Sequence, residues 1–240
     1  MERRVPEKPD LSEKGGPKDG RPQSLDRRLF MQLLAFGDCR DTEPLIDVLE
    51  ASALVGALYA DVNDPRGVAL LTISEDPVAF VGPVRGLLLN PPFDRLVQKP
   101  HYTMLGRSYS IGYEADLEET LIHRPMRTAL NRDWPWVVWY PLRRSGAFTQ
   151  LPPEEQRAIL GEHGQIGFAF GAADYGHDIR LASYGLDQND NDFVVGLVGK
   201  GLHPLSALVQ AMRKTKQTSQ YLERLGPFFV GRAIWQRRQP

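Results

Sequence analysis

The stretch 134–186 constrains this chain most, because it joins a strand-like run to a long helix through a proline-rich turn. The run Trp136–Tyr140 is aromatic and β-branched, which is typical of a strand, and Pro141 is expected to end it. Pro152 and Pro153 suit the first turn of a helix, and apolar residues recur after them at helical spacing. The sequence therefore predicts a strand and a helix here, with the rest of the chain as their scaffold.

His163 falls on the apolar stripe of this helix, near Ile159 and Ile166, with glycines on either side. Two interpretations remain open. A core histidine would donate a hydrogen bond to a neighbouring carbonyl group. A lone axial ligand to a haem iron would need one imidazole on an apolar wall, and the glycines would leave flat space beside it for the macrocycle.

Composition limits the class of protein. The 240 residues are 42% hydrophobic and 25% charged, enough for one large domain or two fused halves that share a core. A net charge of -1 gives no general attraction for nucleic acid. The single cysteine, Cys39, excludes an intrachain disulfide framework, and no apolar run is long enough to cross a bilayer. We therefore expect a soluble cytoplasmic protein with neither nucleic acid nor membrane as a partner.

The order of predicted elements divides the chain. Residues 1–24 are rich in charge, proline and glycine and have almost no large apolar side chains, so we expect a disordered tail. Residues 25–130 predict strand, helix, strand, helix, strand, with one helix along the apolar stripe 45–58 and the last strand over 104–113. Residues 131–240 partly repeat this order. We expect an α+β protein of two ferredoxin-like halves, 25–130 and 131–240, whose sheets pack into one core.

Arg180 is a fixed cation inside an otherwise apolar strand. One interpretation is an ion pair with Asp178, Asp187 or Asp192. The other is an arginine over a haem face, where it would hold an anionic oxidant or stabilise negative charge as an oxygen bond breaks. The basic segment 212–218 is interpreted as a solvated helix end, although its cations would also attract an anionic ligand.

Several motifs stand in order along the second half: Tyr140-Pro141, the helix that begins with prolines and glutamates, Glu162-His163-Gly164, the run from Ser183 to Asp187 and the run from Gly226 to Gly231. With this set of motifs, about residues 134–235 resemble the chlorite dismutase family, which also contains the coprohaem decarboxylases. The resemblance implies a dimeric α+β barrel of two ferredoxin-like halves, assembled as a homopentamer, with haem b in the C-terminal half.

The resemblance also assigns residues on the proximal side of the haem. His163 corresponds to the iron ligand, and Gln217 or Thr218 stands where the family has a carboxylate hydrogen-bonded to that ligand. A neutral partner would give the imidazole less anionic character and so less electron push toward the iron. Arg143 and Arg144 occupy positions where the family places cations near the haem propionates.

The distal residue stays open between two candidates. Counted back from Gly185 without gaps, the family position of a distal arginine or glutamine falls on Asp178. Arg180 lies two residues further on, so it points to the same face of a strand and would take that place with a small bulge. Tyr140 corresponds to the tyrosine that, in the decarboxylases, carries a radical to the coprohaem propionates.

Three functions follow from the resemblance. The first is a haem-dependent oxidoreductase with haem b as cofactor, which converts chlorite to chloride and dioxygen or carries out related peroxide chemistry, with Arg180 steering the small anionic oxidant. The second is decarboxylation of coprohaem, which is then the substrate, in haem b biosynthesis, with Tyr140 as the relay. The third is a non-catalytic haem-binding or structural oligomer.

Overall fold

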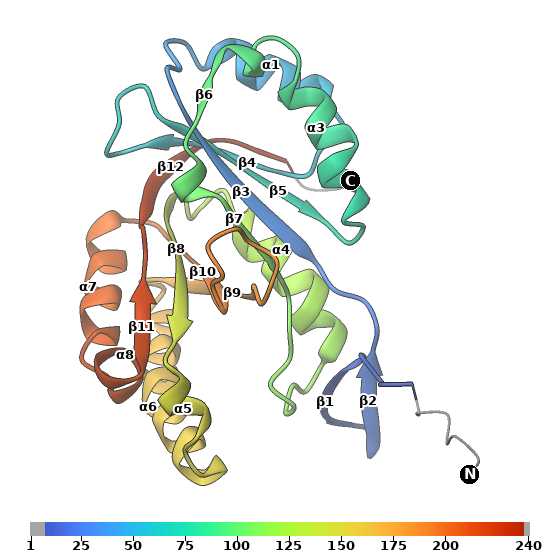
Figure 1. Cartoon of the computed structure of the whole chain (residues 1–240), viewed down its shortest axis with the longest axis vertical. Coiled ribbons are helices and arrows are strands. Elements are labelled where there is room, and N and C mark those ends of the chain that lie inside the picture. The colour runs from blue at the N-terminus through green and yellow to red at the C-terminus, as the bar shows by residue number, and fades with distance from the viewer. Residues whose placement is uncertain (1–7, 238–240) are drawn as a thin grey trace, which may run out of the picture.

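Strands close into a barrel in the computed structural model, which describes residues 8–237 (Figure 1). Around the ring, each strand pairs with the next in the order β8, β10, β9, β7, β3, β5, β4, β12 and back to β8. The short strands β11 (Leu222–Leu225) and β6 (Val97–Gln98) add to β8 and β3. The strands of the ring are β3 (Phe30–Gly37), β4 (Gly56–Asp61), β5 (Val68–Ser74), β7 (Met104–Arg107), β8 (Trp136–Arg144), β9 (His177–Ala182), β10 (Phe193–Gly199) and β12 (Phe229–Arg237).

The two halves of the ring have the same strand order. In the first half the sheet runs β4, β5, β3, β7, and in the second it runs β9, β10, β8, β12. Numbered along each half, both orders are second, third, first, fourth strand, which is the ferredoxin-like arrangement. The predicted α+β fold of two ferredoxin-like halves is therefore confirmed, whereas the residue boundary between 130 and 131 stays a prediction.

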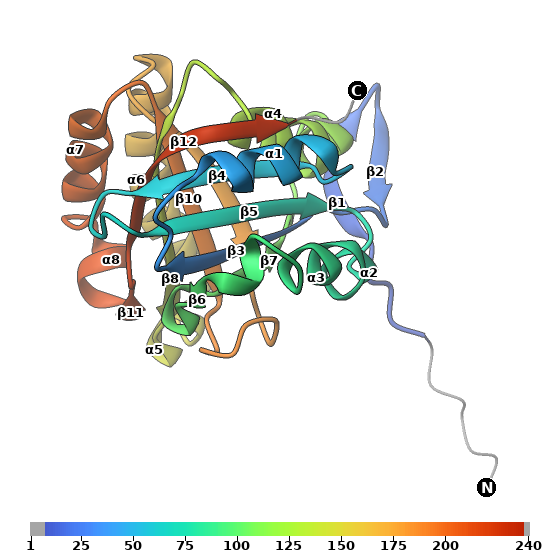
Figure 2. The ribbon, with the colours of Figure 1, turned by 90° about the horizontal axis from the view of Figure 1, so that it is seen from above.

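Helices cover the outer faces of the two halves differently. Over β3, β4 and β5 lie α1 (Glu43–Ala51), α2 (Val78–Val81) and α3 (Pro83–Leu88) (Figure 2). On the other half lie α5 (Gly146–Thr149), α6 (Pro153–Ala172), α7 (Leu202–Met212) and α8 (Lys216–Gln220) (Figure 1). A π-helical turn (Glu119–His123) leads into α4 (Arg124–Ala129), and 3₁₀ turns occupy Phe93–Arg95 and Pro100–Tyr102.

Three apolar clusters follow from strand alternation. Inward-facing residues of both halves fill the barrel, where Trp139 and Tyr59 are fully buried. The outer face of the first half packs against α1, with Leu45 and Leu49 over Leu70. The third cluster lies between the second half and α7. Both faces of β5 and β10 are buried, so the sequences of these two strands are almost continuously apolar, whereas β9 alternates.

Some sequence-based boundaries were wrong. The apolar stripe 45–58 is not one helix, since α1 ends at Ala51 and the chain turns into β4. Strand β7 ends at Arg107, and the predicted continuation to residue 113 is loop. Pro141 does not end β8: it lacks an N–H, yet its carbonyl accepts a hydrogen bond from Gly226 N at 2.9 Å, and the strand continues to Arg144.

The predicted disordered tail is also wrong over most of its described part. Residues Glu13–Lys18 (β1) and Arg21–Leu25 (β2) form an antiparallel hairpin, while residues 1–7 lie outside the described part of the chain. Asp19 and Gly20, between the strands, have φ of 50° and 75°. A two-residue Asp-Gly turn with both φ angles positive matches the twist of the two strands in a hairpin. This dipeptide therefore predicts the hairpin, although the composition of the segment favours disorder.

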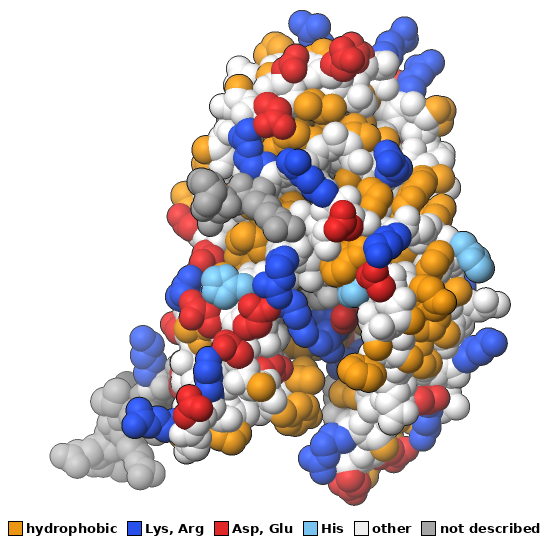
Figure 3. All heavy atoms as spheres, turned by 180° about the vertical axis from the view of Figure 1, so that it is seen from behind, with side chains coloured by type: hydrophobic (Ala, Val, Ile, Leu, Met, Phe, Trp, Pro, Cys, Tyr) orange, Lys and Arg blue, Asp and Glu red, His pale blue; other side chains and the backbone are white. Residues whose placement is uncertain are grey.

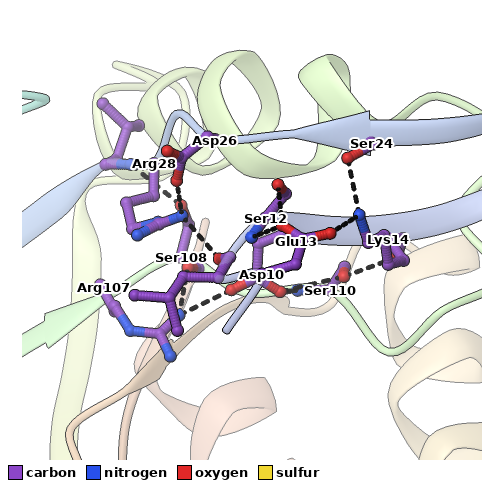
Figure 4. Close-up of polar contacts among 12 residues, drawn as sticks. Asp10, Ser12, Glu13, Lys14, Ser24, Asp26, Arg28, Arg107, Ser108 and Ser110 are labelled. Atoms are coloured by element: carbon purple, nitrogen blue, oxygen red, sulfur yellow. Dashed lines mark hydrogen bonds and ion pairs between the residues drawn. The ribbon is translucent and has the colours of Figure 1, made fainter. Parts of the chain in front are cut away.

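Polar contacts hold the hairpin against the loop after β7 (Figure 4). The Glu13 carboxylate accepts hydrogen bonds from Arg107 Nη1 at 2.7 Å and from the Ser110 N–H and hydroxyl, both at 3.0 Å (Figure 4). The Gln23 amide donates to Glu114 O at 2.8 Å and accepts from Leu117 N at 3.0 Å. The hairpin is thus ordered by hydrogen bonds to charged and backbone groups. The small number of apolar side chains in this segment does not indicate such bonds.

Gly196 tests how tightly the barrel is packed. It pairs with Trp139 across β8 and β10, and a Cβ at this position would lie 2.6 Å from the indole ring. Gly196→Ala should lower the free energy of unfolding by about 1–3 kcal/mol, because the buried ring has nowhere to move. Urea denaturation measures the loss. The matched control is Gly86→Ala in α3, where a Cβ would meet nothing within 4 Å and helix propensity should raise stability slightly; equal stability of both variants would contradict the tight packing.

Candidate functional site

A cavity of about 440 Å³ lies between α6, α7 and α8 on one side and the strands β8 to β11 on the other. Seen from behind, the lower half of the molecule is hollowed, and Lys and Arg side chains gather at the hollow (Figure 3). The cavity has the size typical of ligand sites, and its lining is mostly apolar with a few polar groups. The polar and charged lining residues are Tyr140, His163, Asp178, Arg180, Arg213, Gln217 and Thr218.

Helix α6 leaves this space because it packs on the sheet with little of its surface. Of its residues only Ile159 is buried. Near its N-terminal end it is held to α8: Glu155 pairs with Lys216 Nζ at 2.9 Å, and Glu162 accepts a hydrogen bond from Lys216 N at 3.0 Å. The helix is therefore held here by polar contacts rather than by a continuous apolar face.

Asp174 holds the other end of α6. Its carboxylate accepts a hydrogen bond from Trp134 Nε1 at 3.1 Å, lies 2.9 Å from His177 Nε2 and pairs with Lys200. Trp134 and His177 stack with ring centroids 3.6 Å apart. Lys200 and then His177 lower the pKa of Asp174 to about 2, so the carboxylate stays charged. This cluster joins the start of β8, the end of α6, the start of β9 and the segment after β10.

Glycines on α6 open the helix surface toward the cavity. Gly164 and Gly167 line it, and a Cβ at Gly164 would meet nothing within 4 Å. Phe168, one turn after Gly164, also lines the cavity and is 79% exposed. The helix surface beside His163 therefore has open space at Gly164 and an exposed aromatic ring at Phe168.

Among residues 8–237, the His163 imidazole hydrogen-bonds through one ring nitrogen only, Nδ1. Its Nδ1 lies 3.3 Å from Thr215 Oγ1, and the Thr215 hydroxyl donates its own proton to Met212 O at 2.8 Å. The Thr215 oxygen therefore accepts from Nδ1–H, which leaves the Nε2 lone pair free. Burial, and then the positive charges of Arg144 and Arg180, lower the pKa of His163 below its ordinary value, so the ring is neutral at neutral pH.

The neutral partner expected for His163 is therefore Thr215 instead of Gln217 or Thr218. Thr215 is 1% exposed and caps α8, and its hydroxyl oxygen accepts from Thr218 N at 3.4 Å. Gln217 lines the cavity, but its side-chain Oε1 is buried and has no hydrogen-bond partner in the described part of the chain. Position in the sequence indicates the right segment but not the right residue. The structure selects Thr215 because, as the N-cap of α8, it has its hydroxyl beside the imidazole.

Asp178 and Arg180 both line the cavity, from β9. Asp178 Oδ2 lies 2.9 Å from Arg180 Nε, so the ion pair that the sequence left open is made with Asp178. Neither side chain is buried, contrary to the expectation of a buried arginine: the two are 47% and 46% exposed. Ile179 and Leu181, the alternate residues, face the barrel core.

Tyr140 lies in the wall of the same cavity, on β8. Its ring stacks on Phe228 with centroids 4.6 Å apart. Burial, and then the negative charge of Asp178, raise the pKa of the phenol well above its ordinary value, so it keeps its proton. The fold thus brings Tyr140, His163, Asp178 and Arg180, predicted as site residues, to one cavity.

The sequence matches the family model described as chlorite dismutase over residues 96–234, which is more than half of the chain. The chain belongs to the chlorite dismutase family. This family includes haem enzymes. The search of curated proteins returned no match.

Solved structures show the same fold. A chlorite dismutase from Candidatus Nitrospira defluvii, in complex with imidazole, is 15% identical with a TM-score of 0.66 and covers 87% of this chain and 92% of its own. A mutant of that enzyme in complex with cyanide gives the same values. A haem-binding protein from Thermus thermophilus is 19% identical with a TM-score of 0.68 and covers 97% of this chain and 96% of its own. At these identities the likeness extends to the fold alone.

Two residues predicted to bind haem lie outside the cavity lining of this family member. Arg143 pairs with Asp190 at 2.6 Å and lies 3.6 Å from Glu223. Arg144 stacks over the rings of Phe148 and Phe193, 4.8 and 4.6 Å from their centroids. Their contact with haem propionates therefore stays a prediction.

Arg213 lines the cavity instead, although no motif in the sequence singles it out. It lies just after α7, where its guanidinium is 5.7 Å from the centroid of the Phe228 ring, and none of the carboxylates described in residues 8–237 pairs with it. The signal was the basic segment 212–218, which had been interpreted as a solvated helix end. Only the folded chain shows which of its cations faces inward.

Two features are absent from the described residues, 8–237. No group of three or more His, Cys, Asp or Glu side chains there is arranged to hold a metal ion. No helix in that part of the chain is long and apolar enough to span a membrane.

Gly164 offers a direct test of the cavity as a ligand site. Gly164→Leu should place a side chain in the empty space beside His163 and lower the affinity for haemin by at least about tenfold. Haemin titration followed by absorption measures it. Gly161→Leu is the matched control, because Gly161 lies on the same helix, has equal open space and does not line the cavity. Equal affinities in the two variants would contradict this assignment.

Proposed function

We propose that this family member binds haem in the cavity and acts as a haem-dependent oxidoreductase on a small oxidant, with His163 as the iron ligand. The observation that carries the proposal is the neutral imidazole beside open, mostly apolar space, oriented by Thr215 so that Nε2 keeps its lone pair. Bound haem b would supply a redox-active iron at which chlorite or a peroxide is reduced.

The other lining residues suit the same ligand. A haem has an apolar face and two carboxylates, and the cavity offers apolar helix and strand surface together with Arg213, a cation without a carboxylate partner among residues 8–237. We assign Arg213 to a haem carboxylate. Apolar residues such as Leu208 and Val195 would exclude water from the ring.

We assign Arg180 to the oxidant. It lines the cavity from the sheet, whereas His163 lines it from α6, so the two side chains belong to different walls. A guanidinium in that place would hold an oxygen of the oxidant by a charge-assisted hydrogen bond. Thr215, as a neutral partner of His163, gives less electron push than a carboxylate would. The homopentamer and the cytoplasmic location implied by the resemblance stay predictions.

Removal of the imidazole tests the proposal. His163→Ala should lower the affinity for haemin by at least about tenfold and change the absorption spectrum of any haem that remains bound, because the iron loses its protein ligand. His203→Ala, at an exposed position on α7, is the control and should bind haemin like the wild type. An unchanged spectrum in His163→Ala would remove the proposed ligation.

A second function, decarboxylation of coprohaem, is favoured by one observation. The Tyr140 phenol keeps its proton, lies in the cavity wall and has Arg213 among the charges near it. If Arg213 holds a propionate, Tyr140 is in the right wall to act on that group. Coprohaem would then be the substrate rather than haem b the cofactor.

Tyr140→Phe separates the two functions. As a haem b oxidoreductase, the variant should keep most of its activity with chlorite or peroxide, because the aromatic ring and its stacking on Phe228 remain. As a decarboxylase it should lose conversion of coprohaem to haem b, measured by chromatography and mass. Wild-type protein that converts no coprohaem would exclude the second function, and protein that binds neither porphyrin would leave a structural oligomer.

A further inference from the structure

The ion pair of Asp178 and Arg180 is the charged feature of the cavity that the proposed function uses only in part. Strand alternation puts both side chains on one face of β9, with Asp178 Oδ2 2.9 Å from Arg180 Nε. Each is about half exposed, so both remain accessible to a ligand. Nε of Arg180 is occupied by its neighbour, and the two charges cancel locally.

This neutral ion pair should bind anionic oxidants and neutral oxidants with different affinities. An anion that approaches Arg180 also approaches the negative charge of Asp178, and it must compete with that carboxylate for the guanidinium. A neutral hydroperoxide has both an O–H group and lone pairs. It can donate to the Asp178 carboxylate while it accepts from the free N–H groups of Arg180.

The other charges of the cavity do not restore attraction for an anion. Arg213 is the remaining guanidinium in the lining, and the proposed function assigns it to a carboxylate of the haem. The proposed function assigns His163 to the haem iron as a neutral ligand, so this residue adds no positive charge. Asp178 therefore decides the charge that a ligand meets beside Arg180.

A second, smaller cavity supports the same conclusion. It has a volume of about 20 Å³, enough for one water molecule, and it also borders Asp178 and Arg180. Ser108, Tyr109 and Thr120 line it together with Glu114 and Arg124, which carry opposite charges. This lining offers both donors and acceptors to a small neutral hydroxylic molecule.

We propose that Asp178 makes this site selective for neutral peroxides over anionic oxidants such as chlorite. The inference rests on the proposed function, because the selectivity acts on ligands of the bound haem. This selectivity is a difference in binding affinity between ligands, and Asp178 is the residue that determines it.

The test compares an anionic and a neutral ligand of the haem-loaded protein. Azide is the anionic probe and imidazole the neutral one, both titrated by absorption spectroscopy. Asp178→Asn, which keeps the size of the side chain and removes its charge, should tighten azide binding by roughly tenfold and change imidazole binding little. Adding Arg180→Ala to Asp178→Asn should remove that gain, because no cation then remains beside the ligand.

Asp190→Asn is the matched control. Asp190 also pairs with an arginine, Arg143, at 2.6 Å, but it does not line the cavity. This variant should bind azide and imidazole like the wild type, which separates a local effect from a change in net charge.

Each other outcome overturns the inference in a recognisable way. Unchanged azide affinity in Asp178→Asn, or an equal gain in Asp190→Asn, would show that Asp178 does not select the ligand. Loss of haem uptake in Asp178→Asn alone would show that it serves the fold or the porphyrin. A wild-type protein that takes up no haem would remove the proposed function, and the inference with it.

Discussion

Pairing between the edge strands of the two halves is the constraint on which the rest of the structure depends. Each ferredoxin-like half has two edges, and unpaired edges expose backbone groups that must find partners. Here β4 pairs with β12 along most of their length, and β7 meets β9 at Arg107 and Ala182. Gly106 permits that second junction, since a Cβ there would lie 2.6 Å from Leu181 Cβ. Closure fixes β9, and with β9 the position of the Asp178 and Arg180 pair.

The two halves have the same topology but differ in how a helix packs on the outer face of the sheet. Over the first half, Leu45 and Leu49 of α1 fill the outer face of the sheet with apolar side chains. Over the second half, α6 buries only Ile159 and is held by polar contacts at both ends, through Lys216 and Asp174. Between α6 and the second sheet there is therefore a cavity, whereas the space between α1 and the first sheet is filled by apolar side chains. Function follows from incomplete packing on one of two similar sheets.

The chemistry of the cavity depends on which charges face each other. Burial and the charges of Arg144 and Arg180 keep His163 neutral, and Thr215 orients it. Arg213 remains available to a ligand carboxylate, and Asp178 neutralises Arg180. In a space partly shielded from water, such pairings decide which ligand charge is accepted. Under the function proposed above, the residues of this cavity, and not family membership alone, would decide which oxidant is accepted.

The sequence by itself determined the strand and helix order of the second half, the repetition of the fold, the family, and the residues Tyr140, His163, Asp178 and Arg180 as candidates. These depend on periodicity and on short motifs, which are local. Tertiary structure decided the rest. It placed an ordered hairpin within residues 13–25, where composition predicted disorder, because that order depends on side-chain hydrogen bonds to a loop about a hundred residues away. It also chose Thr215 as the partner of His163 and turned Arg213 inward, because both depend on how α7 and α8 approach α6, and no local pattern in the sequence encodes that approach.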